Sequence, residues 1–207
     1  MCNLYWHRSI NFGDMLSPYL LSKLKGEINY VEANDPEHKY ILTGSILSVP
    51  MQNASVFGAG FINETDVLTG SANIIAVRGK LTQQKVGGMV GEPSMCLPYF
   101  YNPKPHKKRL VGYTPHIMDY KPGQHNIDLR MGEDETIVDA VERVIYQINE
   151  CGHIVSSSLH GLIVAKAYGI PYTYVHSDSL VGDGFKFRDF FASEYDVKKI
   201  YDSLLSI

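Results

Sequence analysis

Apolar residues recur at helical spacing in three segments of the chain. In the segment 11–25, four leucines fall on one face of a helix, and Gly26 stands where that helix should end. The segment 133–150 has the clearest amphipathic pattern, with acidic residues at its start and Gly152 just behind it. The segment 196–205 has the pattern of a closing helix. The hydrophobic periodicity therefore predicts three helices with one buried face each.

Short runs of apolar and β-branched residues between turn-forming residues predict strands. We expect these strands at residues 4–6, 28–31, 40–43, 55–58, 73–77, 109–113, 126–129 and 172–176, with one more ending near residue 155. Because strands and helices alternate, the sequence predicts an α/β protein with mostly parallel sheets. The residues 181–191, which combine glycines with aromatic side chains, are expected to form a loop.

The stretch 154–171 carries the most informative pattern. A short apolar run ends a buried strand, three serines follow, and an almost uniformly apolar helix begins at about Leu159. Gly169 and Pro171 stand where this helix should stop. Together with the strand 172–176, the pattern predicts a strand–helix–strand unit with a right-handed crossover.

The serine turn of this unit lies between the end of a strand and the start of a helix. Free backbone N–H groups and the positive end of the helix dipole gather at such a turn and suit a bound anion. Ser157 and Ser158 add hydroxyl donors, and His160 adds a side chain that titrates near neutral pH. The turn is therefore a candidate active site. The same residues are also typical of a plain helix cap with a structural histidine.

Four other polar residues stand at the ends of predicted strands or the starts of predicted helices. Asn11 and Asp14 open the first helix, either as a simple cap or as ligand-binding groups. Arg78 follows a strand, so it is either a two-pronged clamp for a carboxylate or phosphate, or a surface ion-pair residue. His116 also follows a strand, and in a parallel sheet it would face the same edge as the serine turn.

The composition narrows the function classes. Of the 207 residues, 44% are hydrophobic and 20% are charged, which is ordinary for a soluble globular protein. A net charge of −3 without a lysine- or arginine-rich face argues against nucleic-acid binding. The three cysteines have neither zinc nor disulfide spacing, so we expect a reducing compartment and no metal. Without the pattern of a signal peptide or an integral membrane segment, the chain is expected to be cytoplasmic.

One glycine motif is only partly similar to a dinucleotide-binding motif. Gly58–Ala59–Gly60 is similar to the start of a dinucleotide-binding loop. Asn63, however, stands where the last glycine of that loop is needed for close helix packing. We therefore expect no dinucleotide cofactor.

Several short motifs occur in an order that resembles the polysaccharide pyruvyl transferase family. Along the chain they are Asn11–Phe12–Gly13–Asp14, Gly44–Ser45–Ile46–Leu47, Gly58–Ala59–Gly60–Phe61, Arg78–Gly79 with Thr82, Pro115–His116, Ser156–Ser157–Ser158–Leu159–His160–Gly161 and Lys186–Phe187–Arg188–Asp189–Phe190. The serine block is the most specific of them. The chain departs from the family in two respects: Glu92 stands where the family usually has Asp, and the chain is shorter than typical members.

The resemblance implies two Rossmann-like halves in an arrangement similar to GT-B glycosyltransferases. The expected lobes are residues 1–102, on the acceptor side and shortened, and residues 103–207, on the donor side. The resemblance further implies transfer of an enolpyruvyl group from phosphoenolpyruvate onto two hydroxyls of a sugar in a polysaccharide or glycan precursor. The product is a pyruvate ketal, and phosphate is released. The scheme requires no cofactor besides this donor substrate, and it allows peripheral contact with a lipid-linked glycan.

The resemblance also suggests roles for individual residues. His160 is expected to be the acid–base residue, His116 to assist it, and Arg78 to bind the charged donor. The expected substrate-binding residues are polar groups of the same motifs: Asn11, Asp14, Ser157, Ser158, Lys186 and Arg188.

Two other functions fit the same architecture. A glycosyltransferase would place the diphosphate of a nucleotide sugar at the start of the helix near Leu159. A carbohydrate-binding accessory protein would keep the architecture without turnover. A serine hydrolase fits poorly, because the chain has no G-x-S-x-G motif.

Overall fold

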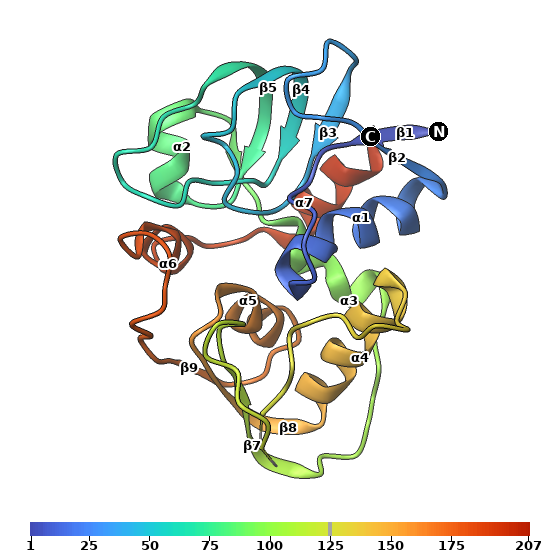
Figure 1. Ribbon diagram of the computed structural model, residues 1–207, viewed down its shortest axis with the longest axis vertical. Coiled ribbons are helices and arrows are strands. Elements are labelled where there is room, and N and C mark those ends of the chain that lie inside the picture. The colour runs from blue at the N-terminus through green and yellow to red at the C-terminus, as the bar shows by residue number, and fades with distance from the viewer. Residues whose placement is uncertain (124–125) are drawn as a thin grey trace.

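The computed structural model describes residues 1–123 and 126–207, and it contains two parallel β-sheets surrounded by helices (Figure 1). The strands of the first sheet are β1 (Cys2–Leu4), β2 (Ile28–Tyr30), β3 (Lys39–Ile41), β4 (Met51–Phe57), β5 (Gly70–Val77) and β6 (Met89–Val90). Those of the second sheet are β7 (Arg109–Thr114), β8 (Cys151–Ser156) and β9 (Tyr172–Tyr174). The predicted α/β class with mostly parallel sheets is confirmed, and it is compatible with two Rossmann-like halves.

The helices connect and cover these strands. They are α1 (Phe12–Lys25), α2 (Lys80–Val86), the 3₁₀ helix η1 (Pro93–Cys96), α3 (Leu97–Phe100), α4 (Ile137–Asn149), α5 (Leu159–Ala167), α6 (Phe185–Phe191) and α7 (Val197–Leu205). In the described part of the chain, none of them has the length and apolar character that a membrane crossing needs.

The first sheet has the strand order β2-β1-β3-β4-β5-β6. The chain pairs β2 with one side of β1 and then crosses to pair β3 with the other side. The direction of winding therefore changes between β1 and β3. Ligands of open parallel sheets bind at such a point, in the crevice outside the carboxyl ends of the strands. The loop that follows β1 leads directly to the start of α1.

The second sheet contains the predicted strand–helix–strand unit. β8 and β9 pair in parallel, and α5 connects them. Ser156 at the end of β8 pairs with Thr114 of β7 and with Tyr174 of β9. The three strands therefore end in one row, and the turns that follow them leave the sheet at the same edge.

The start and end of α1 agree with the sequence prediction. Asn11 caps the helix, and its side-chain oxygen accepts the Gly13 N–H at 3.5 Å. Gly26 follows the last residue with φ 78°, in the left-handed region that favours glycine. Leu16, Leu20 and Leu21 are buried in the core, so the predicted apolar face packs inward.

The two halves share one continuous hydrophobic core, in which α1 lies against α4. At the rim of this contact, the Tyr19 hydroxyl donates to the Glu142 carboxylate at 3.1 Å, and the Lys23 ammonium lies 2.9 Å from the same carboxylate. At the start of α1, the Phe12 N–H donates to the Leu129 carbonyl at 2.7 Å. The start of α1 is therefore held by the second half of the chain.

The last two helices return to the first half (Figure 1). α7 packs against η1, and α6 packs against α2. The Asp189 carboxylate of α6 accepts the Thr82 N–H at 2.9 Å and the Thr82 hydroxyl at 2.7 Å. The segment 101–108 connects the two sheets, but α6 and α7 pack across that division. The acceptor and donor sides remain predictions.

Several predicted boundaries are wrong, among them the starts of β4 at Met51 and of β5 at Gly70, which lie before the predicted residues 55 and 73. β1 begins at Cys2, two residues before the predicted strand. α4 begins at Ile137 rather than near residue 133, because Thr136 and Asp139 form a reciprocal capping box. Gly152 does not stop this helix; the helix ends at Asn149 and Gly152 lies inside β8.

Two predicted elements take another form. The residues 126–129 form no regular strand: Asn126 makes an isolated bridge to Tyr113, and the Ile127 N–H donates to the Tyr113 carbonyl at 2.7 Å. The segment 185–191, predicted as part of a loop, forms α6. Its start is fixed by the Asp183 carboxylate, which accepts the Phe185 N–H at 2.8 Å.

Candidate active site

The starts of α1 and α5 meet at Gly13 and His160. A Cβ atom on Gly13 would lie 2.1 Å from Nδ1 of His160, so the imidazole packs directly on the backbone of the first turn of α1. Ser158 occupies the cap position of α5 but makes no side-chain capping hydrogen bond. Two positive helix ends therefore converge around one histidine. The first N–H groups of α1 are engaged within the protein, since Phe12 donates to the Leu129 carbonyl and Gly13 to the Asn11 side chain.

His160 is a neutral imidazole at neutral pH. Burial and the positive charges of Arg78 and Lys186 lower its pKa to about 3. Within residues 1–123 and 126–207, neither ring nitrogen has a hydrogen-bond partner. The side chain can therefore accept a proton from a bound ligand, and a negative ligand beside it would raise its pKa.

Lys186 supplies the unpaired charge of this site. Burial lowers the pKa of its ammonium group, Arg78 lowers it further, and Asp14 opposes both. In the part of the chain that the structure describes, its Nζ has neither a hydrogen-bond partner nor an ion-pair partner, and the ring of Phe187 lies 5.6 Å away. A half-buried ammonium group without a partner is suited to an anionic ligand.

Asp14, in the first turn of α1, is close enough to Lys186 for their charges to interact. Burial raises the pKa of its carboxyl group, and a 2.6 Å hydrogen bond from the Ser9 hydroxyl opposes this effect. The nearby charges of His7 and Lys186 also lower the pKa of Asp14. Asp14 therefore partly balances Lys186. Asn11 lies next to it and is engaged as the cap of α1.

The serine turn and His116 lie side by side, at the shared edge of the second sheet. The His116 N–H donates to the Ser157 Oγ at 2.9 Å, so the Ser157 hydroxyl proton remains available to a ligand. Ser156 braces the turn: its hydroxyl donates to the Thr114 carbonyl at 2.8 Å and accepts the Ser158 N–H at 2.9 Å. Burial and the charge of Lys186 lower the pKa of His116.

Arg78 is close enough to affect His160, but its own side chain is 1% exposed. Its guanidinium donates to the Ser45 Oγ and to the Phe61 carbonyl, both at 2.6 Å, and its Nε lies 3.3 Å from the Asp189 carboxylate. The side chain is thus neither an exposed clamp nor a surface ion pair. It contributes buried positive charge to the site.

Arg188 points away from this cluster. Its guanidinium donates to the Glu64 carboxylate and to the Asp183 carbonyl, both at 2.8 Å. The structure therefore brings together His160, His116, Lys186, Asp14 and the serine turn, with Arg78 behind them. It leaves Arg188 on the other side of α6.

Sequence reasoning assigned no role to three residues that shape the site. Gly13 leaves the space that His160 fills. The Asp189 carboxylate lies beside the Arg78 guanidinium and anchors α6 to Thr82. Glu92 is fully buried; burial raises its pKa to about 7, and one carboxylate oxygen accepts the Ser94 N–H at 3.1 Å. Gly13 and Asp189 belong to motifs that resemble the family, and this membership was the only sequence signal for them. Their partners lie more than 100 residues away in the sequence.

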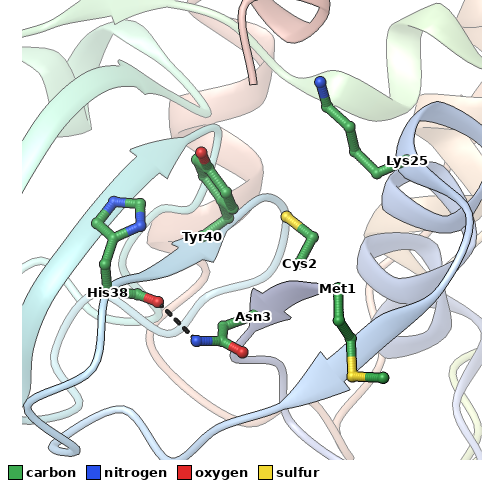
Figure 2. A pocket seen from close by; sticks show the side chains of 6 residues that line it. All are labelled: Met1, Cys2, Asn3, Lys25, His38 and Tyr40. Atoms are coloured by element: carbon green, nitrogen blue, oxygen red, sulfur yellow. Dashed lines mark hydrogen bonds between the residues drawn. The ribbon is translucent and has the colours of Figure 1, made fainter.

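A separate hollow of about 380 Å³ lies at the opposite edge of the first sheet, where β1 and β3 begin (Figure 2). The Asn3 side chain donates to the His38 carbonyl at 3.1 Å there. Burial raises the pKa of the Cys2 thiol, which disfavours the reactive thiolate. This hollow is therefore a weaker candidate. Within residues 1–123 and 126–207, no group of three or more histidine, cysteine or acidic side chains could hold a metal ion.

Comparisons with known proteins give distant similarities. No family model matches the chain. An uncharacterized protein of Acanthamoeba polyphaga mimivirus is 27% identical over 230 aligned residues, which cover 97% of this chain and 78% of the viral protein. Among solved structures, an uncharacterized protein from Klebsiella pneumoniae matches with a TM-score of 0.48 and 10% identity, covering 98% of this chain and 87% of that one. These similarities name no activity, so the function is argued from the site.

Proposed function

We propose that the protein transfers an enolpyruvyl group from phosphoenolpyruvate to a sugar, forming a pyruvate ketal in the cytoplasm. The sugar belongs to a polysaccharide or glycan precursor. One observation carries the proposal: a neutral His160 lies in the first turn of α5, whose start has no side-chain cap, and the unpaired ammonium group of Lys186 is close enough to lower its pKa. A small phosphorylated acid supplies the negative charge that this arrangement lacks. The order of the sequence motifs favours the same donor.

The donor carries two anionic groups, and the site offers two kinds of partner. The first-turn N–H groups of α5 and the hydroxyl of Ser158 suit a phosphate. The ammonium group of Lys186 suits a phosphate or a carboxylate. Arg78, whose guanidinium is engaged by protein groups, strengthens both interactions through its charge rather than by contact.

The proposed reaction forms two C–O bonds at the central carbon of the donor and breaks the bond from that carbon to the phosphate oxygen. Two sugar hydroxyls lose their protons; one proton goes to the methylene carbon and the other leaves with phosphate. Neutral His160 can accept the first hydroxyl proton. Because the anionic donor raises the pKa of His160, this side chain can then hold the proton for the methylene carbon. His116, fixed beside Ser157, can assist at the second hydroxyl.

A thermal-shift titration tests donor binding. Phosphoenolpyruvate should raise the unfolding midpoint, whereas UDP-galactose and GDP-mannose should leave it unchanged. Lys186→Met should abolish the shift, and Lys198→Met, which removes an exposed lysine of α7, should preserve it. The reverse ligand pattern would favour a glycosyltransferase, since the start of α5 can also receive a diphosphate. Absence of a shift with phosphoenolpyruvate contradicts the proposal.

Phosphate release tests turnover. With galactose- and mannose-ended acceptors, the wild-type protein should release phosphate from the bound donor. If no acceptor leads to phosphate release, the protein binds the donor without catalysing transfer. A His160→Ala variant that binds the donor and still releases phosphate at the wild-type rate would remove His160 from its proposed role.

A further inference from the structure

A second hollow lies against the other face of α6. Its volume is about 580 Å³, and sites for small molecules commonly have about 300–1,000 Å³. The rings of Tyr174, Phe187 and Phe191 form a cluster along it: the ring of Tyr174 lies 4.6 Å from that of Phe187 and 5.8 Å from that of Phe191, measured between centroids. Phe191 is 46% exposed, so its ring is accessible to a ligand. The hollow therefore has an accessible aromatic surface.

The lining also includes polar and charged side chains beside Leu180 and two glycines. Asp178, Asp183, Arg188 and His176 contribute carboxylates, a guanidinium and an imidazole. The Arg188 guanidinium is held in place by the Asp183 carbonyl at 2.8 Å. An aromatic surface bordered by hydrogen-bonding groups matches a ligand with one apolar face and many hydroxyls.

The hollow is close to the candidate active site but distinct from it. The loop after β9 is tied to the loop that carries His116, because the Ser177 hydroxyl donates to the Asp119 carboxylate. Both loops leave the same edge of the second sheet. On α6, Phe187, Arg188 and Phe191 are rotated by about 100° or more from Lys186, so they lie on another side of the helix. The two sites are therefore neighbours on different sides of α6, and the Lys186 Nζ of the first lies 5.6 Å from the Phe187 ring that lines the second.

We propose that this hollow binds a sugar ring of the acceptor glycan, a neighbour of the ring that reacts. The assignment of the sugar to the acceptor rests on the proposed function, whereas the assignment of a sugar as ligand rests on the lining of the hollow. The aromatic rings would pack against the C–H face of the sugar, and the charged groups would bind its hydroxyls. The carboxylates of Asp178 and Asp183 disfavour a nucleotide phosphate, so a neutral sugar fits better than a nucleotide.

Saturation-transfer NMR tests the inference with four probes: methyl β-galactoside, methyl α-mannoside, lactose and mannobiose. At least one should receive saturation from the wild-type protein. Phe191→Ala should reduce that signal at least fivefold, and Phe191→Trp should retain it, because tryptophan preserves the aromatic surface. Tyr99→Ala, which removes an exposed aromatic ring of α3, should have no effect.

The thermal shift with phosphoenolpyruvate, measured on the same variants, separates the two proposals. Saturation of no probe, or equal saturation in the Phe191→Ala variant, overturns the inference even where phosphoenolpyruvate binds. Saturation that Phe191→Ala removes, in a protein without response to phosphoenolpyruvate, keeps the sugar site and removes the proposed donor. Displacement of the sugar by uridine monophosphate would overturn the preference for a neutral ligand.

Discussion

At the scale of single residues, the site depends on buried groups whose charge is set by their neighbours. Burial and two cations lower the pKa of His160 and keep it neutral, whereas complete burial raises the pKa of Glu92. The two shifts have different consequences. A neutral His160 leaves the site positively charged and ready for an anion. A raised pKa of Glu92 makes the stability of the fold depend on pH.

The free energy of unfolding of the Glu92→Gln variant should rise relative to that of the wild type as the pH increases from 5 to 8. The pKa of Glu92 is about 7 in the folded protein and about 4.5 in the unfolded chain, so its contribution to stability is complete below pH 4.5 and is lost as the pH rises through 7. The difference in free energy of unfolding between the two proteins should therefore grow by about 1–3 kcal/mol. Urea unfolding at both pH values measures it.

Glu194→Gln is the matched control, since Glu194 is exposed. Its difference from the wild type should stay nearly constant over the same range. A constant difference for Glu92→Gln would show that the Glu92 carboxyl titrates normally.

At the scale of elements, α6 connects the site to the first half of the chain. Asp189 accepts two hydrogen bonds from Thr82 and lies beside the buried guanidinium of Arg78. One residue of α6, Lys186, faces the anion site, while Phe191 and its neighbours line the second hollow. The position of this one short helix thus determines the geometry of the anion site and of the second hollow.

Asp189→Asn should destabilise the protein by about 3 kcal/mol, because it leaves the buried charge of Arg78 without its partner. It should also weaken phosphoenolpyruvate binding, since α6 carries Lys186. Asp202→Asn, which breaks the exposed pair with Lys198, should have little effect on stability. Chemical denaturation of both variants makes the comparison, and equal costs would contradict the structural role of Asp189.

The sequence predicted the elements whose signals are local. Asn11 and Gly26 mark the ends of α1, and the serine turn marks the start of α5, within a few residues of each helix. α6 was missed although the Asp183 carboxylate that fixes its start is local; its packing depends on Asp189 and Thr82, which are 107 residues apart. The start of α4 was misplaced although its signal, Thr136 followed by Asp139, is local.

The candidate residues could be predicted individually, but their environments could not. Strand ends and helix starts indicated His160 and His116. Nothing near Arg78 in the sequence indicated that Ser45, Phe61 and Asp189 would surround its guanidinium. Such burial arises from long-range packing, which local patterns do not contain.

At the scale of the whole molecule, the site lies where the two halves meet. α1 belongs to the first half and α5 to the second, and His160 of one packs on Gly13 of the other. The shared core and the contact between α1 and α4 hold these helix starts together. Binding at the site should therefore respond to changes in this contact.

Gly13→Ala should displace the imidazole of His160, because the new Cβ would lie 2.1 Å from its Nδ1. We expect a loss of stability of about 1–3 kcal/mol from overpacking and at least a tenfold weaker binding of phosphoenolpyruvate. In a His160→Ala background, the same change should cost little stability. A double-mutant cycle by chemical denaturation checks this; additive costs would show that the two residues do not touch.

An anionic donor should bind against Lys186 and His160, at the start of α5. NMR titration of the histidine side chains, with and without phosphoenolpyruvate, detects this binding at the imidazole itself. Phosphoenolpyruvate should shift the His160 resonance and raise its pKa from about 3 toward neutrality, and Lys186→Met should suppress the response. An unchanged resonance and pKa of His160 at a saturating concentration of phosphoenolpyruvate would rule this binding mode out.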